Sequence, residues 1–384
     1  MSPLKAMSGG KWLMWVLAAA ILLPACAGLH RGAPPSQSPT VVAPFELVGK
    51  LQKVSYSPGT YTEQLKFSEY SISPTVLPAV QQPASSAGVA PAFQSTLNYT
   101  FGDGLYGLAI GPGRSILFSS FSKVWFGKLN RNGTMQVYTL PSVGYRQGGS
   151  ITSTPDGAIW VAQSASESLL GRLSPSGSYE QFPVHGRLGA LSPASDNSVW
   201  SAERDEKSGE KIVHVSSTGQ ETDYLMPKGE LGYGRVIWGP DGALWFPINY
   251  GIGRLTTDGS YSRIKLAGQP FDVAFAADGT IWMMTSYGQS MGALQHWSAS
   301  GTQIASEPLH FNSQAIAVAG DGTVWFTGGF SVPSGGAYVY QVGRFKSGRL
   351  DTYRVSDYAA GLVVDGNSIW FARMNGISMF TPPD

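Results

Sequence analysis

The chain has 384 residues, of which 48 are glycine, 12% are aromatic and only 13% are charged. Glycine disfavours helix interiors and aromatic side chains suit pleated sheets, so this composition favours strands and turns over helices. The formal net charge of +1 creates no general field that would attract an acidic partner, and we therefore expect no nucleic-acid binding.

Residues 1–25 have the features of a signal peptide. Lys5 and Lys11 supply positive charge, and the apolar run from Trp12 to Leu23 is too short for a comfortable membrane span. The run ends in Leu23-Pro24-Ala25-Cys26, which resembles the lipobox of bacterial lipoproteins, where cleavage before the cysteine frees it for lipidation. We therefore expect a lipid anchor at Cys26 that attaches the chain to a membrane of the bacterial cell envelope.

Cys26 is the only cysteine in the chain, and a buried core thiol is the alternative interpretation. In Gram-negative bacteria, the absence of aspartate after such a cysteine usually accompanies sorting to the outer membrane, and here the next residue is Ala27. We expect the outer membrane or the periplasmic face. A single cysteine forms no disulfide within the chain, so stability must come from burial and sheet hydrogen bonds.

Residues 26–91 are rich in proline and serine, which favour extended and poorly packed backbone. We interpret this region as a tether. Within it, Val54-Ser55-Tyr56 and Leu65-Lys66-Phe67 alternate as short strands do. The alternative is therefore that the stretch from Phe45 to Ser73 forms short strands on the outside of the domain that follows.

Residues 92–384 repeat one pattern, a tight polar turn followed by an apolar strand with a central tryptophan. The clearest copy is Gly239-Pro240-Asp241-Gly242-Ala243-Leu244-Trp245-Phe246. The central position recurs about every 42 residues, which suits a propeller blade of four short antiparallel strands. It is occupied by Leu117 in a degenerate first copy and then by Trp160, Trp200, Trp245, Trp282, Trp325 and Trp370. Seven copies predict an all-β fold, a seven-bladed β-propeller of four-stranded antiparallel blades.

The closure of this propeller is predicted by its two ends. The seventh copy shows a third strand at residues 377–380 and no fourth, whereas residues 95–101 precede the first copy without a blade of their own. We expect residues 95–101 to supply the outer strand of the seventh blade, because this pairing leaves no exposed edge there.

The repeat resembles a known family. Its pattern is Pro-Asp-Gly-x-Leu/Ile-Trp-Phe, then Ile-Gly-Arg-Leu, then Asp-Gly-Ser-Tyr, and Gly239 to Leu255 carry it best. This pattern resembles the virginiamycin B (streptogramin B) lyase family. The resemblance implies a seven-bladed propeller and, for the founding lyases, a magnesium-dependent elimination that opens the cyclic antibiotic at its ester linkage.

The resemblance also implies where the chemistry would lie. Family members place a histidine in a Glu-Pro-His-Gly element for proton transfer and a metal-binding glutamate soon after Trp-Phe-Thr. Aligned on the fifth tryptophan, this chain has Gln269 in place of the first glutamate, Phe271 in place of the histidine and Thr285 in place of the metal ligand. Phenylalanine transfers no proton, and neutral amide and hydroxyl groups are poor substitutes for carboxylates around magnesium. We expect no lyase activity.

Propeller ligands bind where loops converge on the central channel, and we expect the residue three after each tryptophan to face that opening. Further candidates stand near the starts of the first strands. The candidate ligand-binding residues are Tyr106, Gln163, Arg187, Glu203, Gln269, Phe271, Asn312, Tyr358 and Arg373. Their mixed, mildly aromatic character suits a small neutral organic, carbohydrate or peptide ligand.

Glu203 is the one carboxylate among these channel positions. A single glutamate makes only part of a magnesium site, and we expect Glu203 and Arg373 to pair or to face water. The Asp-Gly turns supply one aspartate per hairpin, which favours a structural role over calcium binding. The five histidines are interpreted as structural or solvated.

These observations predict a monomeric cell-envelope lipoprotein whose propeller is a ligand-binding or interaction scaffold without a cofactor. The first alternative is a divalent-cation-dependent lyase or lactone hydrolase with a rearranged site around Glu203, in which case magnesium is the cofactor. The second alternative is a purely structural domain at the membrane surface.

Overall fold

The computed structural model describes most of the predicted propeller and several segments before it. All described residues lie in the unit formed by residues 39–384. The predicted signal peptide (residues 1–25) and Cys26 lie outside the described residues. The described ranges are 46–56, 68–71, 75–77, 97–100, 105–120, 123–141, 147–164, 168–205, 209–232, 234–288, 291–310, 312–331, 338–355, 358–366, 368–373 and 376–380.

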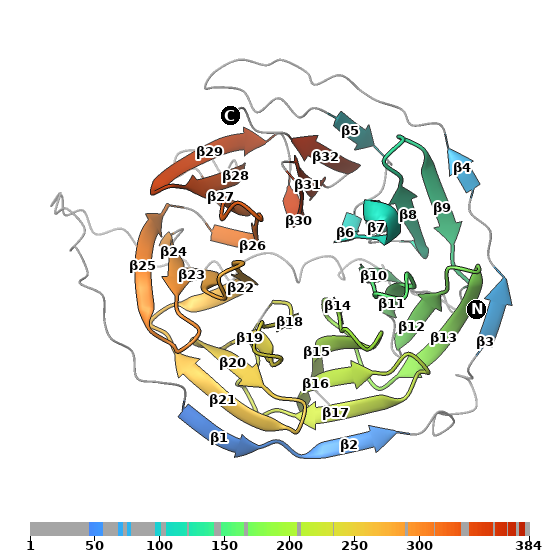
Figure 1. Ribbon diagram of the computed structural model, residues 1–384, viewed down its shortest axis with the longest axis horizontal. Helices are drawn as coiled ribbons and strands as arrows, with labels where there is room; N and C mark the ends of the chain where they lie inside the picture. Colours follow the sequence, from blue (N-terminus) through green and yellow to red (C-terminus); the bar gives the residue numbers. More distant parts are fainter. Residues whose placement is uncertain are drawn as a thin grey trace, which may run out of the picture. The chain divides into compact units, whose positions relative to one another are not determined.

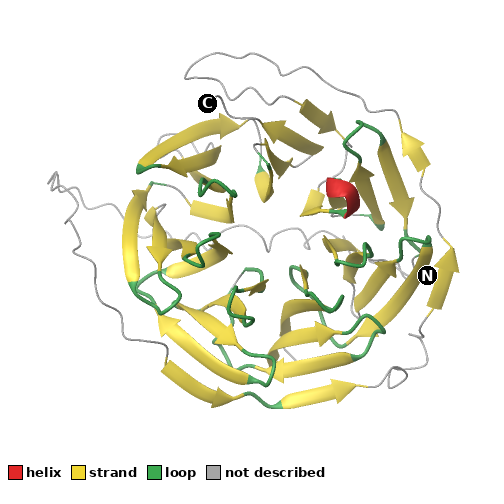
Figure 2. Ribbon diagram, viewed as in Figure 1, coloured by secondary structure: helices red, strands yellow, loops and turns green. Residues whose placement is uncertain are grey.

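Seven antiparallel sheets follow one another in a ring, and each sheet is one blade (Figure 1). The described part of the chain is almost entirely strand and loop, with a single 3-10 turn, η1, at Pro112–Arg114 (Figure 2). Across these described ranges, no helix has both the length and the apolar character needed to cross a membrane. The all-β propeller expected from the repeat is confirmed.

The first four blades follow the chain in order. The first strand of each blade lies innermost and the fourth lies outermost. Their strands are β6 (Leu105–Ile110), β7 (Ile116–Ser120), β8 (Trp125–Leu129) and β9 (Met135–Thr139) in blade 1; β10 (Gln147–Ser153), β11 (Ile159–Ser164), β12 (Ser168–Leu173) and β13 (Ser178–Val184) in blade 2; β14 (Ser192–Pro193), β15 (Val199–Asp205), β16 (Gly209–Val215) and β17 (Glu221–Leu225) in blade 3; β18 (Ile237–Trp238), β19 (Leu244–Ile248), β20 (Gly251–Leu255) and β21 (Ser260–Lys265) in blade 4.

The remaining blades include the one that closes the ring. In blade 7, β5 (Leu97–Thr100) pairs antiparallel with β32 (Gly376–Phe380), so residues from before the first blade supply the outer strand of the last. The predicted closure by residues 95–101 is thus confirmed. The other strands are β22 (Gln269–Phe275), β23 (Ile281–Gly288), β24 (Met291–Trp297) and β25 (Gln303–Leu309) in blade 5; β26 (Asn312–Val318), β27 (Val324–Ser331), β28 (Tyr338–Lys346) and β29 (Arg349–Val355) in blade 6; β30 (Ala359–Asp365) and β31 (Ser368–Arg373) in blade 7.

Four further strands add a fifth strand to four blades, and we call them the N-terminal strap. β1 (Glu46–Lys50), β2 (Lys53–Tyr56), β3 (Ser68–Ser71) and β4 (Thr75–Leu77) pair with the outer strands of blades 4, 3, 2 and 1, in that order (Figure 1). β1, β2 and β3 lie within residues 45–73, where outer strands are the alternative expectation, and β4 lies beyond that stretch. Leu65-Lys66-Phe67, which are expected to form one of these strands, lie outside the described residues. An outer edge offers unpaired backbone groups to an added strand. The sheets therefore begin at Glu46, before residue 92.

The core is divided into seven hydrophobic clusters, one between each pair of neighbouring blades. Between blades 3 and 4, Trp200 and Tyr224 pack with Phe246. The cluster between blades 7 and 1 contains Trp370 and Phe118, so the ring is packed all the way round. A blade has two apolar faces and buries them only against its neighbours, which makes the stability of each blade dependent on the next.

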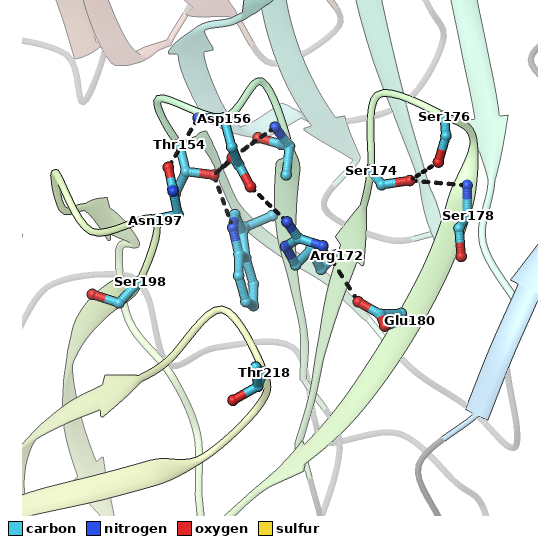
Figure 3. Close-up of polar contacts among 12 residues, drawn as sticks. Thr154, Asp156, Arg172, Ser174, Ser176, Ser178, Glu180, Asn197, Ser198 and Thr218 are labelled. Atoms are coloured by element: carbon cyan, nitrogen blue, oxygen red, sulfur yellow. Dashed lines mark hydrogen bonds and ion pairs between the residues drawn. The ribbon is translucent and has the colours of Figure 1, made fainter.

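The Asp-Gly turns have a structural role, which blade 2 shows in detail (Figure 3). Asp156 accepts a hydrogen bond from the Ala158 backbone N–H (3.1 Å) and pairs with Arg172 of the third strand (2.5 Å). The Arg172 guanidinium lies 5.7 Å from the ring centre of Trp160, whose indole N–H donates to Thr154 Oγ1 (3.2 Å). One aspartate thus shapes the turn and holds an arginine over the buried tryptophan.

The same arrangement recurs in other blades. Asp241 accepts from the Ala243 N–H (3.2 Å) and pairs with Arg254 (2.7 Å), which lies over Trp245. In blade 6, Lys346 pairs with Asp321 (2.9 Å). These contacts agree with the structural interpretation of the turns, because the carboxylates are already paired with backbone groups and cations.

Glycine in the third strand makes room for an aromatic ring, which explains the Gly in the Ile-Gly-Arg-Leu pattern. A Cβ atom at Gly343 would lie 2.0 Å from the Phe326 ring, and one at Gly253 would lie 2.6 Å from the Phe246 ring. In blade 2, a Cβ atom at Gly171 would lie 1.9 Å from Tyr179 Oη. The rings cover the glycine backbone and fill the core between blades.

We predict that Gly343→Ala lowers the free energy of unfolding by about 1–3 kcal/mol, because the new methyl group overlaps the fully buried Phe326 ring. Gly320→Ala in the same blade is the control, since a Cβ atom there meets nothing within 4 Å; its effect should stay within about 0.5 kcal/mol. Urea unfolding of both variants measures the difference, and equal stabilities would contradict the packing role of the glycine.

We predict that deletion of residues 92–103 lowers the melting temperature by more than about 5 °C, because it removes β5 and opens the seventh blade. Deletion of residues 46–56 removes β1 and β2 but leaves blades 3 and 4 with four strands each. This control deletion should have the smaller effect. A melting temperature unchanged by the first deletion would refute closure by β5.

Candidate functional site

Strand direction places the candidate residues on one face of the propeller. Neighbouring strands in every blade are antiparallel, so the connection entering the first strand and the loop leaving the second strand lie on the same side. We call this side the loop face. The Asp-Gly turns and the turns between the third and fourth strands lie on the opposite side.

The expectation that the residue three after each tryptophan faces the channel opening is not met at several positions. Gln163 and Glu203 are 0% exposed, and Ile248 and Thr285 are also buried. Gln163 Nε2 donates to Tyr179 Oη (2.8 Å) inside the sheet. At Glu203 and Ile248 the connection from the preceding blade crosses the end of the strand, where Leu188 bridges to Glu203 and Leu231 bridges to Ile248.

The blade 5 positions singled out by the family resemblance have structural contacts. The Gln269 side-chain amide donates to the Ile248 carbonyl (3.3 Å), and its oxygen accepts from the Tyr250 N–H (3.1 Å). Thr285 donates to the Ala293 carbonyl (3.4 Å). Phe271 is half-buried beside these residues in β22. The group around Gln269 is therefore a hydrogen-bonded joint between blades 4 and 5.

A charged pair next to Phe271 was not identified from the sequence. Asp272 is buried and accepts from Arg235 Nε (2.9 Å) and from the Ile316 N–H (3.0 Å). Arg235 also donates to the Ile316 carbonyl. This network joins the entrances of blades 4, 5 and 6, and its sequence signal is an acidic residue within the mainly apolar first strand β22.

The other predicted residues are spread over the loop face. Arg187 is exposed in the connection between blades 2 and 3, and Arg373 is partly buried at the end of β31. Tyr358 meets Tyr340 edge-on, with ring centroids 5.7 Å apart. The side chains of Tyr106 and Asn312 lie outside the described residues. The structure thus brings Gln269 and Phe271 together and places Arg187, Tyr358 and Arg373 on other blades.

Two exposed tyrosines beside Gln269 were also missed. Tyr250 is 62% exposed and Tyr287 is 45% exposed, although aromatic rings usually lose contact with water on folding. The Tyr250 N–H is held by Gln269, and Tyr287 Oη accepts from Gln295 Nε2 (2.8 Å). Gly268 lies between them and leaves room for the Tyr287 ring. In the sequence only a turn position hints at Tyr250, and Tyr287 lies in strand β23, where no such signal marks it.

Glu203 belongs to a buried charged cluster in the interface between blades 2 and 3. The Lys211 ammonium lies 3.1 Å from Glu203 Oε2 and 2.6 Å from Asp223 Oδ2, and it donates to the His185 carbonyl (2.6 Å). Glu221 accepts from the His185 backbone N–H (3.2 Å) and lies 3.1 Å from His185 Nδ1. We call these five residues the interface cluster. Glu203 thus pairs with Lys211 and does not face water, contrary to the sequence-based expectation.

The backbone at Gly186 passes directly against the Glu203 carboxylate and helps to bury the interface cluster. Gly186 has a positive φ of 107°, and a Cβ atom there would lie 1.4 Å from Glu203 Oε1. Glycine is therefore required where the connection between blades 2 and 3 crosses the Glu203 carboxylate. Glu203, Glu221 and Asp223 are 0% exposed and Lys211 is 2% exposed.

Burial dominates the proton affinities in the interface cluster. Burial raises the pKa of Glu203 to about 7, and the pKa of Asp223 is raised to about 6 by burial and by the neighbouring Glu221. Burial alone lowers the pKa of the Lys211 amine, but Glu203 and Asp223 raise it above its ordinary value. At neutral pH Lys211 is therefore an ammonium, and Glu203, whose pKa lies near 7, is partly protonated.

The interface cluster does not fit a magnesium ion. The Lys211 ammonium already occupies the position between Glu203 and Asp223 that a cation would need. Within the described ranges, no group of three or more His, Cys, Asp or Glu side chains is arranged to hold a metal. A rearranged metal site around Glu203 thus has no support from its neighbours.

A pocket of about 340 Å³ lies on the opposite side of the propeller, between blades 1 and 7. Its wall includes Trp370 and Met379, with Arg114 and Arg131 at its edge. Both arginines pair with Asp365, at 2.8 Å for Arg114 Nε. The two positive charges share one carboxylate there, and no predicted site residue contributes to this pocket.

Comparison with known proteins agrees with the architecture. The chain matches the model of the virginiamycin B lyase family over residues 94–378. No curated protein sequence gives a match.

Among solved structures, a streptogramin B lyase is similar over 73% of this chain and 95% of its own, with 20% identity and a TM-score of 0.60. The virginiamycin B lyase of Staphylococcus aureus is similar over 74% of this chain and 98% of its own, with 20% identity and a TM-score of 0.61. YCF48 bound to D1 peptide is similar over 75% of this chain and 95% of its own, with 11% identity and a TM-score of 0.56. At these identities the structural similarity shows the fold alone.

We predict an unusual pH dependence of stability that comes from Glu203. Its pKa is about 7 in the folded chain and near 4.5 when unfolded, so the folded state binds the proton more tightly. Stability therefore falls as the pH rises through this window, and lowering the pH from 7.5 to 5.5 adds about 1–2 kcal/mol from this group.

Urea unfolding at both pH values measures this change, with Glu203→Gln as the matched variant. The variant keeps the size of the side chain and no longer titrates, so its stability should depend less steeply on pH. An identical pH slope in both proteins would show that Glu203 is not the responsible group.

Proposed function

Because this chain belongs to the virginiamycin B lyase family, we propose that it uses the family's propeller as a ligand-binding scaffold at the bacterial cell envelope, without lyase activity. The observation that supports this proposal best is the set of residues in blade 5. Gln269, Phe271 and Thr285 stand where the family resemblance implies proton transfer and metal binding.

The side chains of these three residues supply no general acid or base, and their polar atoms are held by other groups. Phe271 carries no exchangeable proton. The Gln269 amide and the Thr285 hydroxyl are engaged by the backbone of blade 4 and of β24, respectively. The nearby carboxylate, Asp272, is held by Arg235 and by the Ile316 N–H. Magnesium prefers several oxygen ligands, carboxylates above all, and these side chains do not provide them.

The surface beside this joint suits binding. Tyr250 and Tyr287 expose aromatic rings; Gln295 holds the Tyr287 hydroxyl, and Gln269 holds the Tyr250 backbone N–H. A ring held in place, as at Tyr287, loses little conformational freedom on binding, and both rings provide flat apolar contact with a polar group at the edge. This character matches a small neutral organic, carbohydrate or peptide ligand, and we place the binding surface around Tyr250, Tyr287, Gln269 and Phe271.

The proposed location rests on the sequence. Leu23-Pro24-Ala25-Cys26 follows an apolar run and resembles a lipobox. A lipid on Cys26 would hold the scaffold at a membrane surface of the envelope, at the outer membrane or the periplasmic face, with the propeller as a monomer beside it.

We predict that the purified chain does not open the ring of a streptogramin B antibiotic in the presence of magnesium, since the proton-transfer histidine is replaced by Phe271. Mass spectrometry of the antibiotic measures ring opening, and the virginiamycin B lyase of Staphylococcus aureus is the active control. Ring opening that is abolished by a chelator would refute the proposal. Stoichiometric magnesium binding that disappears in Glu203→Ala would instead favour a lyase or lactone hydrolase with a rearranged site.

A further inference from the structure

The interface cluster contains a nucleophile and an electrophile in direct contact. Lys211 lies in β16 and Asp223 lies in the neighbouring strand β17, on the same face of blade 3. Lys211 Nζ is 2.6 Å from Asp223 Oδ2, and Glu203 Oε2 is 3.1 Å from the same nitrogen. An amine and two carboxyl groups are thus enclosed together, away from water, in the interface between blades 2 and 3.

We propose that Lys211 and Asp223 condense to form an intramolecular amide cross-link, with Glu203 as the proton-transfer group. This inference is independent of the proposed binding function. It follows from the placement of these three side chains and does not involve the loop face.

Burial lowers the cost of reaching the forms that react, although Glu203 and Asp223 keep Lys211 an ammonium in the resting cluster. In a medium of low polarity an ammonium and a carboxylate are costly, whereas the neutral amine and the neutral acid reached by moving one proton between them are not. The neutral amine is the nucleophile and the neutral acid is the better electrophile. Contact within the folded sheet also replaces a bimolecular encounter, and such confinement is equivalent to about 10⁵ M or more of reactant in favourable cases.

The balanced reaction needs no oxidant, reductant or further reactant. The ion pair first becomes neutral as one proton passes from Lys211 Nζ to the Asp223 carboxylate. The Nζ lone pair then forms a bond to Asp223 Cγ, and a second proton leaves Nζ through Glu203 to the departing hydroxyl group. The Cγ–O bond breaks and one water molecule is released, so the product is an amide that has lost one water relative to the two side chains.

Glu203 is placed for this role, and the other acidic group is not. Its raised pKa, about 7, lets it accept and return a proton near neutrality. Glu221 is held by the backbone N–H and ring of His185. The His185 carbonyl accepts from Lys211 Nζ and orients the amine between Glu203 and Asp223. Asp223 is the electrophile because its oxygen lies nearer to Nζ than that of Glu203.

The cross-link would join the third and fourth strands of blade 3 covalently. The fourth strand, β17, also carries β2 of the N-terminal strap on its outer edge. The link therefore secures the strand that carries β2. It also replaces a buried ion pair by a neutral amide, which removes two charges from the core.

The test is digestion of the purified, unfolded chain with a protease that cuts after glutamate. Cuts after Glu210, Glu221 and Glu230 release residues 211–221 and residues 222–230 as separate peptides. With the cross-link they stay joined, as one species whose mass is the sum of the two less one water. Fragmentation should locate the bond at Lys211 and Asp223. This readout does not depend on processing of the N-terminus.

Two variants define the chemistry. Lys211→Arg keeps the positive charge but replaces the primary amine by a guanidinium, which cannot form the amide, so the two peptides should separate. Glu203→Gln removes the proton-transfer group and should lower the linked fraction of freshly folded chain at least about tenfold. Separate peptides of unmodified mass in the natural sequence would overturn the proposal. Separate peptides of which one has lost water would also overturn it, because they would indicate dehydration within one segment.

Discussion

A four-stranded blade has two apolar faces, and neither can be buried within the blade itself. This constraint organises the whole propeller. Seven hydrophobic clusters fill the seven interfaces, and the last of them joins blade 7 to blade 1. Pairing of β5 with β32 completes the seventh sheet, and strands β1 to β4 extend the outer edges of four other blades. Each added strand satisfies backbone groups that would otherwise be unpaired.

The repeated motif serves this packing. In blades 2 and 4 the aspartate of the turn binds the backbone and an arginine, the arginine lies over the tryptophan, and the third-strand glycine admits an aromatic ring. A chain that keeps these contacts keeps the fold. The blade 5 positions that the family resemblance links to catalysis can change without loss of these packing contacts. Here Gln269 and Thr285 connect strands and blades through hydrogen bonds.

The interface between blades 2 and 3 encloses a cluster of charged side chains. Hydrophobic residues such as Phe182 and Val213 fill one part of it, and Glu203, Lys211 and Asp223 occupy another. Charges in such a place are costly unless they are paired closely or neutralised. The close pairing of Lys211 with two carboxyl groups is one answer to that cost, and a covalent amide between Lys211 and Asp223 would be a more complete one.

The sequence by itself determined the architecture: about 42-residue spacing of the tryptophans predicted seven blades, and the unpaired strand at residues 95–101 predicted the closure. It could do so because alternation and turn residues act over a few neighbours and repeat in each blade. Only the tertiary structure decided that Gln163 and Glu203 are buried, that Lys211 contacts Asp223, and that Tyr250 and Tyr287 are exposed. These features depend on strand register and on how one blade's connection crosses the next, as at Gly186, and such contacts between distant segments leave no periodic signal in the chain.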